Sequence, residues 1–161
     1  MVPMDISARL EFPADPATVA AMMNDEGYLA QVCEASDALQ YEVSVSGDTS
    51  TMSRTVATPS AAAKFAGSTL TLVQTMAWGS AQQNGERTAD LNLVVPGQPV
   101  TLKGIAKLTG TDAASVVEVT GDLKVNVPFV GKKLEQAAAP AIVDGIKIQE
   151  TVGRDWLAQR A

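Results

Sequence analysis

Few side chains in this sequence are suited to acid–base, nucleophilic or metal chemistry. It contains no histidine and one cysteine, Cys33. The absence of histidine excludes a Ser-His-Asp triad, a Cys-His pair, a histidine-ligated metal and a histidine proton shuttle. Cys33 shares an apolar helical stripe with Leu29 and Val32, and nothing adjacent would lower its pKa, so a core-filling role is favoured over a nucleophilic one. No carboxylate pair stands out for general acid–base catalysis, and no metal or cofactor is indicated.

Arg54 is the most informative charged residue. In a segment that alternates with period two, it shares a face with the apolar residues Met52 and Val56. An inward guanidinium would need a ligand carboxylate, a phosphate headgroup or an internal acid as its partner, because an unpaired buried charge is costly. In the alternative, more common interpretation, the strand lies near a sheet edge, this face is hydrated, and Arg54 extends to solvent. The sequence leaves the choice between cavity and solvent open.

Two neutral polar residues also lie on apolar strand faces. Gln74 shares its face with Leu72, Met76 and Trp78, and Tyr41 shares its own with leucine and valine. An amide and a phenol could orient a ligand in an otherwise apolar pocket. More commonly, such groups bond a buried backbone group or water, and a tryptophan ring fills a core.

Hydrophobic periodicity predicts the elements that position these residues. Strands are expected at 4–12, 39–46, 49–58, 68–78, 86–95, 100–109 and 114–127, helices at 16–24, 28–36 and 129–159, and a connector with a helical turn at 60–67. Six consecutive strands without intervening long helices indicate an antiparallel meander. Pro140 predicts a bend or break in the last helix, and Gly121 predicts a bulge in the last strand.

Small residues on two facing elements indicate a hollow interior. The last predicted helix offers several in its middle, and the strand at 100–109 offers two on the face of Leu102 and Leu108. These small residues are Ala137, Ala138, Ala139, Ala141, Gly145, Gly104 and Ala106. Small residues that face each other leave space, which a close-packed core tolerates poorly. The alternative is that they let the helix lie closer to the sheet.

Composition and charge restrict the class of protein. With 161 residues, 46% of them hydrophobic, the chain is expected to form a single domain over residues 1–161. The formal charge of −6 disfavours nucleic acid as a partner. The lone cysteine is typical of a reducing compartment, and neither a targeting signal nor an apolar run long enough to span a bilayer is recognisable. A cytoplasmic location is therefore expected.

Two segments carry a resemblance to a known superfamily. They are Leu70-Thr71-Leu72-Val73-Gln74-Thr75-Met76-Ala77-Trp78 and Val125-Asn126-Val127-Pro128-Phe129-Val130-Gly131-Lys132-Lys133-Leu134-Glu135. With its order of elements, the chain resembles the START-related, polyketide-cyclase-like and birch-pollen-allergen-like (SRPBCC) proteins. Within them it most resembles an actinobacterial family described as a domain of unknown function. The resemblance implies an α+β helix-grip fold, in which a curved antiparallel sheet of about seven strands (β-α-α-β6-α) wraps around a long C-terminal helix. It also implies an apolar cavity, and it transfers no catalytic residue.

These observations favour the binding of a hydrophobic or amphipathic small molecule, lipid-like or isoprenoid-like, between the sheet and the last helix. The expected ligand-binding residues are Tyr41, Arg54, Leu72, Gln74, Met76, Trp78, Leu91, Leu93, Leu102, Gly104, Ala106, Ala138, Ala141 and Gly145. The first alternative is a protein-interaction or chaperone-assisting module. The second is a cyclase or lyase in which Tyr41, Arg54 or Gln74 polarises a carbonyl in the same cavity. The sequence leaves the ligand, any reaction and the oligomeric state open.

Overall fold

The computed structural model of the protein describes residues 4–60, 63 and 67–160. The elements in chain order are β1 (Met4–Phe12), α1 (Pro16–Met23), α2 (Glu26–Ala35), β2 (Gln40–Ser46), β3 (Thr49–Ala57), β4 (Thr69–Trp78), β5 (Arg87–Val94), β6 (Val100–Gly110), β7 (Ser115–Val125) and α4 (Gly131–Arg160). These elements confirm the expected strands and the three expected helices, with ends displaced by at most about two residues. The helical turn expected within 60–67 lies largely outside the described residues.

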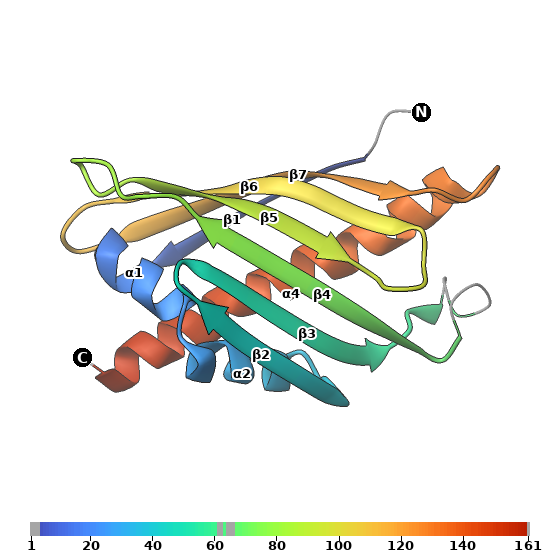
Figure 1. Ribbon diagram of the computed structural model, residues 1–161, viewed down its shortest axis with the longest axis horizontal. Coiled ribbons are helices and arrows are strands. Elements are labelled where there is room, and N and C mark those ends of the chain that lie inside the picture. The colour runs from blue at the N-terminus through green and yellow to red at the C-terminus, as the bar shows by residue number, and fades with distance from the viewer. Residues whose placement is uncertain (1–3, 61–62, 64–66, 161) are drawn as a thin grey trace.

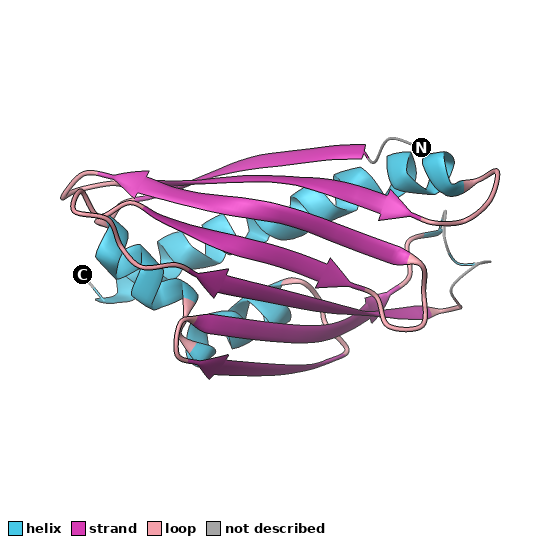
Figure 2. Cartoon of the chain, turned by 45° about the horizontal axis from the view of Figure 1, so that its top comes forward, coloured by secondary structure: helices cyan, strands magenta, loops and turns pink. Residues whose placement is uncertain are grey.

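The strands form one antiparallel sheet in the order β1-β7-β6-β5-β4-β3-β2. The expected meander from β2 to β7 is confirmed, and β1 returns to pair with β7. The helices labelled in Figure 1 lie on one face of the sheet, and α4 crosses that face diagonally. Figure 2 shows the same arrangement, with the strands curving over the long helix. The architecture is the α+β helix-grip fold, in which one face of the sheet and the helices enclose the core.

The N-termini of the two short helices are set by aspartate caps. Asp15 accepts a hydrogen bond from the Thr18 amide at 3.4 Å, and Pro16 supplies the first helical residue of α1. Asp25 caps α2 by accepting from the amides of Gly27 and Tyr28 at 2.8 and 3.3 Å. These bonds satisfy amides that have no partner within the helix.

The core beneath one end of the sheet is closed by aromatic rings. Tyr28 of α2 donates its hydroxyl to the backbone carbonyl of Gln149 in α4 at 2.9 Å, and burial raises its pKa. Its ring meets the Trp156 ring edge-on, with centroids 6.2 Å apart. Gly153 lets α4 approach the ring of Phe12 so closely that a Cβ there would collide with it. This end of the interior is therefore filled.

The continuous pairing of β6 with β7 overturns the bulge predicted at Gly121. The register runs without interruption from Val100–Val125 to Gly110–Ser115. Gly121 lies opposite Gly104, and a Cβ on Gly104 would collide with the backbone of Thr120 and Gly121. A glycine in a strand can mark either a bulge or a close approach of two backbones, and here it serves the second purpose.

Helix α4 continues through Pro140, so the helix is not broken there. Proline frees the carbonyl four residues before it, which belongs to Gln136. Both Gln136 and Pro140 are exposed, so that carbonyl can be hydrated. Near its N-terminus α4 is fixed to the sheet by the buried carboxylate of Glu135, which accepts a hydrogen bond from the Val125 amide at 3.0 Å. Among the described residues, no helix combines the length and the apolar character that crossing a bilayer requires.

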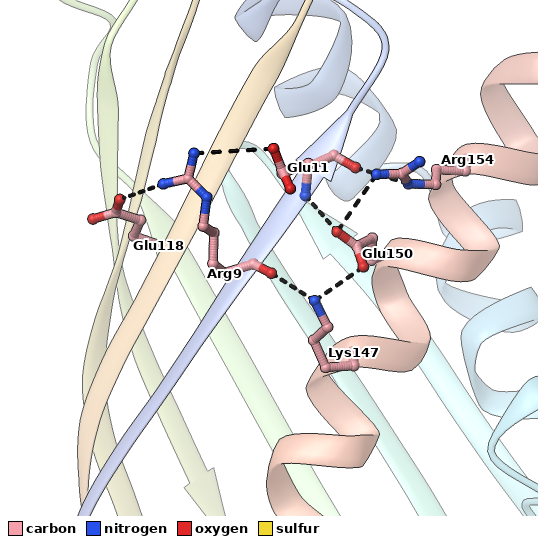
Figure 3. Close-up of polar contacts among 6 residues, drawn as sticks. All are labelled: Arg9, Glu11, Glu118, Lys147, Glu150 and Arg154. Atoms are coloured by element: carbon pink, nitrogen blue, oxygen red, sulfur yellow. Dashed lines mark hydrogen bonds and ion pairs between the residues drawn. The ribbon is translucent and has the colours of Figure 1, made fainter.

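Side chains of α4 also bind the outer edge of β1 (Figure 3). Lys147 donates to the Arg9 carbonyl at 2.7 Å, Glu150 accepts from the Glu11 amide at 2.6 Å, and Arg154 donates to the Glu11 carbonyl at 3.1 Å. β1 is an edge strand, whose outward backbone groups would otherwise be unpaired and open to other chains. Helix α4 is thus bound to the sheet through the backbone of the edge strand β1.

Candidate functional site: an apolar cavity beneath the sheet

A cavity of about 430 Å³ lies between the sheet and the first half of α4. This volume is within the range of small-molecule sites, about 300–1,000 Å³. Its lining comes from β3 through β7, from α4 and from the connections beside them. The apolar strand residues include Val56, Leu70, Leu72, Leu91, Leu93, Leu102 and Val125, and the helix residues include Leu134, Ala137, Ala138, Ala141, Ile142 and Gly145. The cavity runs across the sheet beneath strands that are spaced by about 4.8 Å.

The space exists because α4 presents small side chains to the sheet. Ala137, Ala138, Ala141 and Gly145 lie on the cavity wall, as the sequence predicted for the helix. The sheet side differs from the expectation. Leucine is the commonest residue on the sheet wall, whereas Gly104 serves the backbone contact with β7 and Ala106 is fully buried outside the cavity.

Arg54 points into this cavity, which excludes the interpretation that it extends to solvent. Only 7% of the residue is exposed. Its Nη1 donates to Oγ of Ser36 at 3.0 Å, and Ser36 donates its own proton to the Val32 carbonyl at 2.7 Å. Ion pairs within the described part of the chain do not include Arg54. Burial lowers the pKa of Arg54, and the neighbouring Cys33 acts weakly in the opposite direction.

Gln74 lies on the same face, one strand away. In the register of β3 with β4, Arg54 pairs with Leu72 and Gln74 pairs with Met52, so the two polar side chains are diagonal neighbours. Gln74 is 6% exposed and lines the cavity. Its side-chain amide has no hydrogen-bond partner among the residues that the structure describes. The cavity therefore has a polar end at β3, β4 and the end of α2.

Most of the residues predicted to bind a ligand line this cavity. They are Arg54, Leu72, Gln74, Leu91, Leu93, Leu102, Ala138, Ala141 and Gly145. Their role in binding stays a prediction. The other five predicted residues lie outside the cavity: Gly104, Ala106, Tyr41, Met76 and Trp78. Tyr41 is on the edge strand β2 and is 38% exposed, while Met76 and Trp78 are buried farther along β4, in the filled part of the core.

The cavity also contains residues that the sequence pattern did not indicate. Ser36 ends α2 and orients the guanidinium. The sequence could have indicated Leu70 as a cavity residue, because Leu70 lies on the same alternating strand face as Gln74. Pro99, Val127 and Leu134 come from connections and from the first turns of α4, and no periodicity identifies such positions in advance.

Comparison of sequences decides the family. Residues 7–157 match a family described as "Protein of unknown function (DUF2505)". The chain belongs to the DUF2505 family. No curated protein matches the sequence of this DUF2505 chain.

Solved structures share the fold of the DUF2505 chain at low sequence identity. TTHA0849 from Thermus thermophilus has a TM-score of 0.68 at 12% identity, over 98% of this chain and 99% of the other. The Zhui aromatase/cyclase from Streptomyces sp. R1128 gives 0.59 at 12% identity, over 94% of each chain. A START superfamily protein from Mycobacterium smegmatis gives 0.56 at 13% identity, over 95% and 98%. The resemblance to START-related and cyclase-like proteins is thereby confirmed for the fold.

Proposed function

We propose that this protein binds one hydrophobic or amphipathic small molecule in the cavity between the sheet and α4. The observation that carries the proposal is the cavity wall, which is apolar over nearly all of its extent and ends at two buried polar side chains, Arg54 and Gln74. Apolar area removed from water would supply most of the affinity, at about 25 cal/mol per Å². The polar end would orient the ligand.

Small residues on α4 could instead let the helix pack closely against the sheet. That explanation does not describe the region around the cavity. Close packing occurs at Gly153, where α4 touches the ring of Phe12. Around Ala138 the helix instead leaves an internal space, and lining residues of such a space lose dispersion contacts. A larger residue at Ala138 would recover those contacts, so the open space is more readily explained by a ligand.

The enzymatic alternative loses one of the residues on which it depended. Tyr41 lies on the edge strand outside the cavity, which leaves Arg54 and Gln74 to polarise a carbonyl. Neither is a general base, since a guanidinium stays protonated and an amide does not titrate. The Zhui protein is named an aromatase/cyclase, and its shared fold supports an interior site for a small molecule here.

We retain the cytoplasm as the proposed location, because the chain has one cysteine and that thiol is free and buried.

Binding of the neutral fluorescent dye N-phenylnaphthylamine tests the proposal. We expect saturable binding by the wild-type protein and a loss of at least about tenfold in affinity for Ala138→Leu, which fills the cavity. Ala158→Leu is the matched control, because Ala158 is exposed on α4 outside the cavity, and it should bind the dye normally. Equal binding by the two variants, or no saturable binding by the wild type, would refute the proposal. Native mass spectrometry of the freshly purified protein then identifies any ligand that it retains.

A further inference from the structure

The guanidinium of Arg54 lies in an apolar cavity and has no anionic partner among the residues that the structure describes. Its planar group carries five N–H donors, and among the described residues only Ser36 accepts one of them. Ser36 cannot neutralise the charge, because it contributes a neutral hydroxyl. An unpaired charge in such surroundings is unfavourable, and the lowered pKa of Arg54 has this same cause, desolvation.

Among the described residues that line the cavity, Asp144 is the acidic one, and it does not pair with Arg54. Asp144 is exposed, and it forms no ion pair with Arg54. A buried charge that is left without a compensating partner destabilises a folded protein. Arg54 is therefore poorly explained by the stability of the fold alone.

Local geometry holds the guanidinium in place for an incoming group. The Ser36 hydroxyl donates to the Val32 carbonyl at the end of α2, which fixes its orientation. Its oxygen then accepts a hydrogen bond from Nη1 of Arg54 in a defined direction. On the other side, Gly145 leaves room for Nη2, because a Cβ there would stand 3.3 Å from it. The remaining donors and the side-chain amide of Gln74, which has no hydrogen-bond partner within the described part of the chain, belong to the same polar end of the cavity.

We infer that the ligand is an amphipathic carboxylate, whose anionic head binds Arg54 and whose apolar body extends beneath β4 to β7. This inference rests on the proposed function and specifies the class of ligand. One guanidinium offers one positive charge, which matches a carboxylate and would leave part of a phosphate dianion unneutralised. From β3 at Arg54 to β7 at Val125 the sheet spans about 19 Å at ~4.8 Å per strand, which gives the body of the ligand an elongated shape.

The test compares cis-parinaric acid, a fluorescent fatty acid, with its methyl ester, which has the same chain and no charge. The wild-type protein should bind the acid at least about tenfold more tightly than the ester, a difference of about 1.4 kcal/mol. Arg54→Met should bind both probes alike. Lys103→Met is the matched control, since it removes an equal charge from an exposed position on β6 outside the cavity, and it should retain the preference.

The outcomes separate this inference from the proposed function. If the wild type binds acid and ester equally, or if Arg54→Met keeps the preference for the acid, the carboxylate assignment is wrong while the binding site stands. If neither probe shows saturable binding, the proposed function fails as well. Circular dichroism and thermal unfolding verify that Arg54→Met is folded, and Arg54→Gln, which keeps polarity and removes charge, replaces it if it is not.

Discussion

Nη2 of Arg54 lies against the backbone of Gly145, so that a Cβ on Gly145 would be 3.3 Å from it. Glycine inside a helix destabilises it by up to about 1 kcal/mol relative to alanine. Gly145→Ala should recover most of this free energy, because the end of a flexible side chain can move by a few tenths of an ångström. We expect a higher midpoint of thermal unfolding, together with weaker binding of cis-parinaric acid and unchanged binding of its methyl ester.

The same substitution eight residues later along the same helix should have the opposite effect. A Cβ on Gly153 would collide with the Phe12 ring and press on the Met22 side chain, both in the filled core. Gly153→Ala should therefore lower the unfolding free energy by about 1–3 kcal/mol, the usual cost of overpacking. A stabilised Gly153→Ala would show that α4 can shift on the sheet, and it would remove the argument that the two ends of the helix differ in packing.

Much of the fold could be predicted because an antiparallel sheet with one face on the core imposes period two. β5 illustrates this, since its residues alternate between exposed and buried from Thr88 to Val94. The pairing of β1 with β7 could not be read in this way. Nor could the hold of α4 on β1, because Lys147, Glu150 and Arg154 have the spacing of an ordinary solvated helix face.

The cavity was predictable on its helix side and less so on its sheet side. The period-two alternation of a strand predicts which residues share a face. It does not predict along which part of the strand α4 approaches that face closely. Met76 and Gln74 share a face of β4, yet the diagonal course of α4 places the first in the filled core and the second on the cavity wall. The direction of Arg54 depended on strand order, because β2 forms the edge and β3 lies inside the sheet, with Ser36 of the α2 terminus over Arg54.

Phe129 offers a test of backbone strain. It has a φ of +69° and a fully exposed ring, so it adopts a left-handed conformation without side-chain contacts that would compensate. Such a conformation costs a non-glycine residue about 1 kcal/mol or more. Phe129→Gly should raise the unfolding free energy by about 0.5–1 kcal/mol in urea titrations. Phe129→Ala removes the ring and keeps the strain, so it should leave stability nearly unchanged; equal effects of the two variants would assign the change to the ring.

Cys33 should be inert in the folded protein. Its side chain is fully buried, and burial raises the pKa of the thiol more than the nearby Arg54 lowers it. The thiolate is the reactive form, so both access and ionisation oppose reaction. We expect Ellman's reagent to label Cys33 only after denaturation or at the rate of global unfolding. Rapid labelling of the native protein would show that α2 opens locally and uncovers the polar end of the cavity.

Glu150 should make stability depend on pH in the acid range. Burial would raise the pKa of Glu150. The hydrogen bond from the Glu11 amide and the charges of Lys147 at 3.0 Å and Arg154 at 3.9 Å lower it by more. The pKa of Glu150 therefore lies below its ordinary value of 4.5. A carboxyl whose pKa is lower in the folded state binds fewer protons there than in the unfolded state. Its contribution is therefore fully present above about pH 4.5 and is lost as the pH falls through the lower, folded-state pKa.

Glu150→Gln should accordingly reduce the unfolding free energy by about 1 kcal/mol at neutral pH. The difference from the wild type should shrink as the pH is lowered below 4.5, because protonation of Glu150 removes the same interactions. Glu118→Gln is the matched control: Glu118 also pairs with a basic residue, Arg9, but both side chains are more than half exposed, and such pairs contribute little. Urea unfolding from pH 7 to pH 3 measures both variants. A difference that stays constant with pH would mean that the hold of α4 on β1 does not depend on the charge of Glu150.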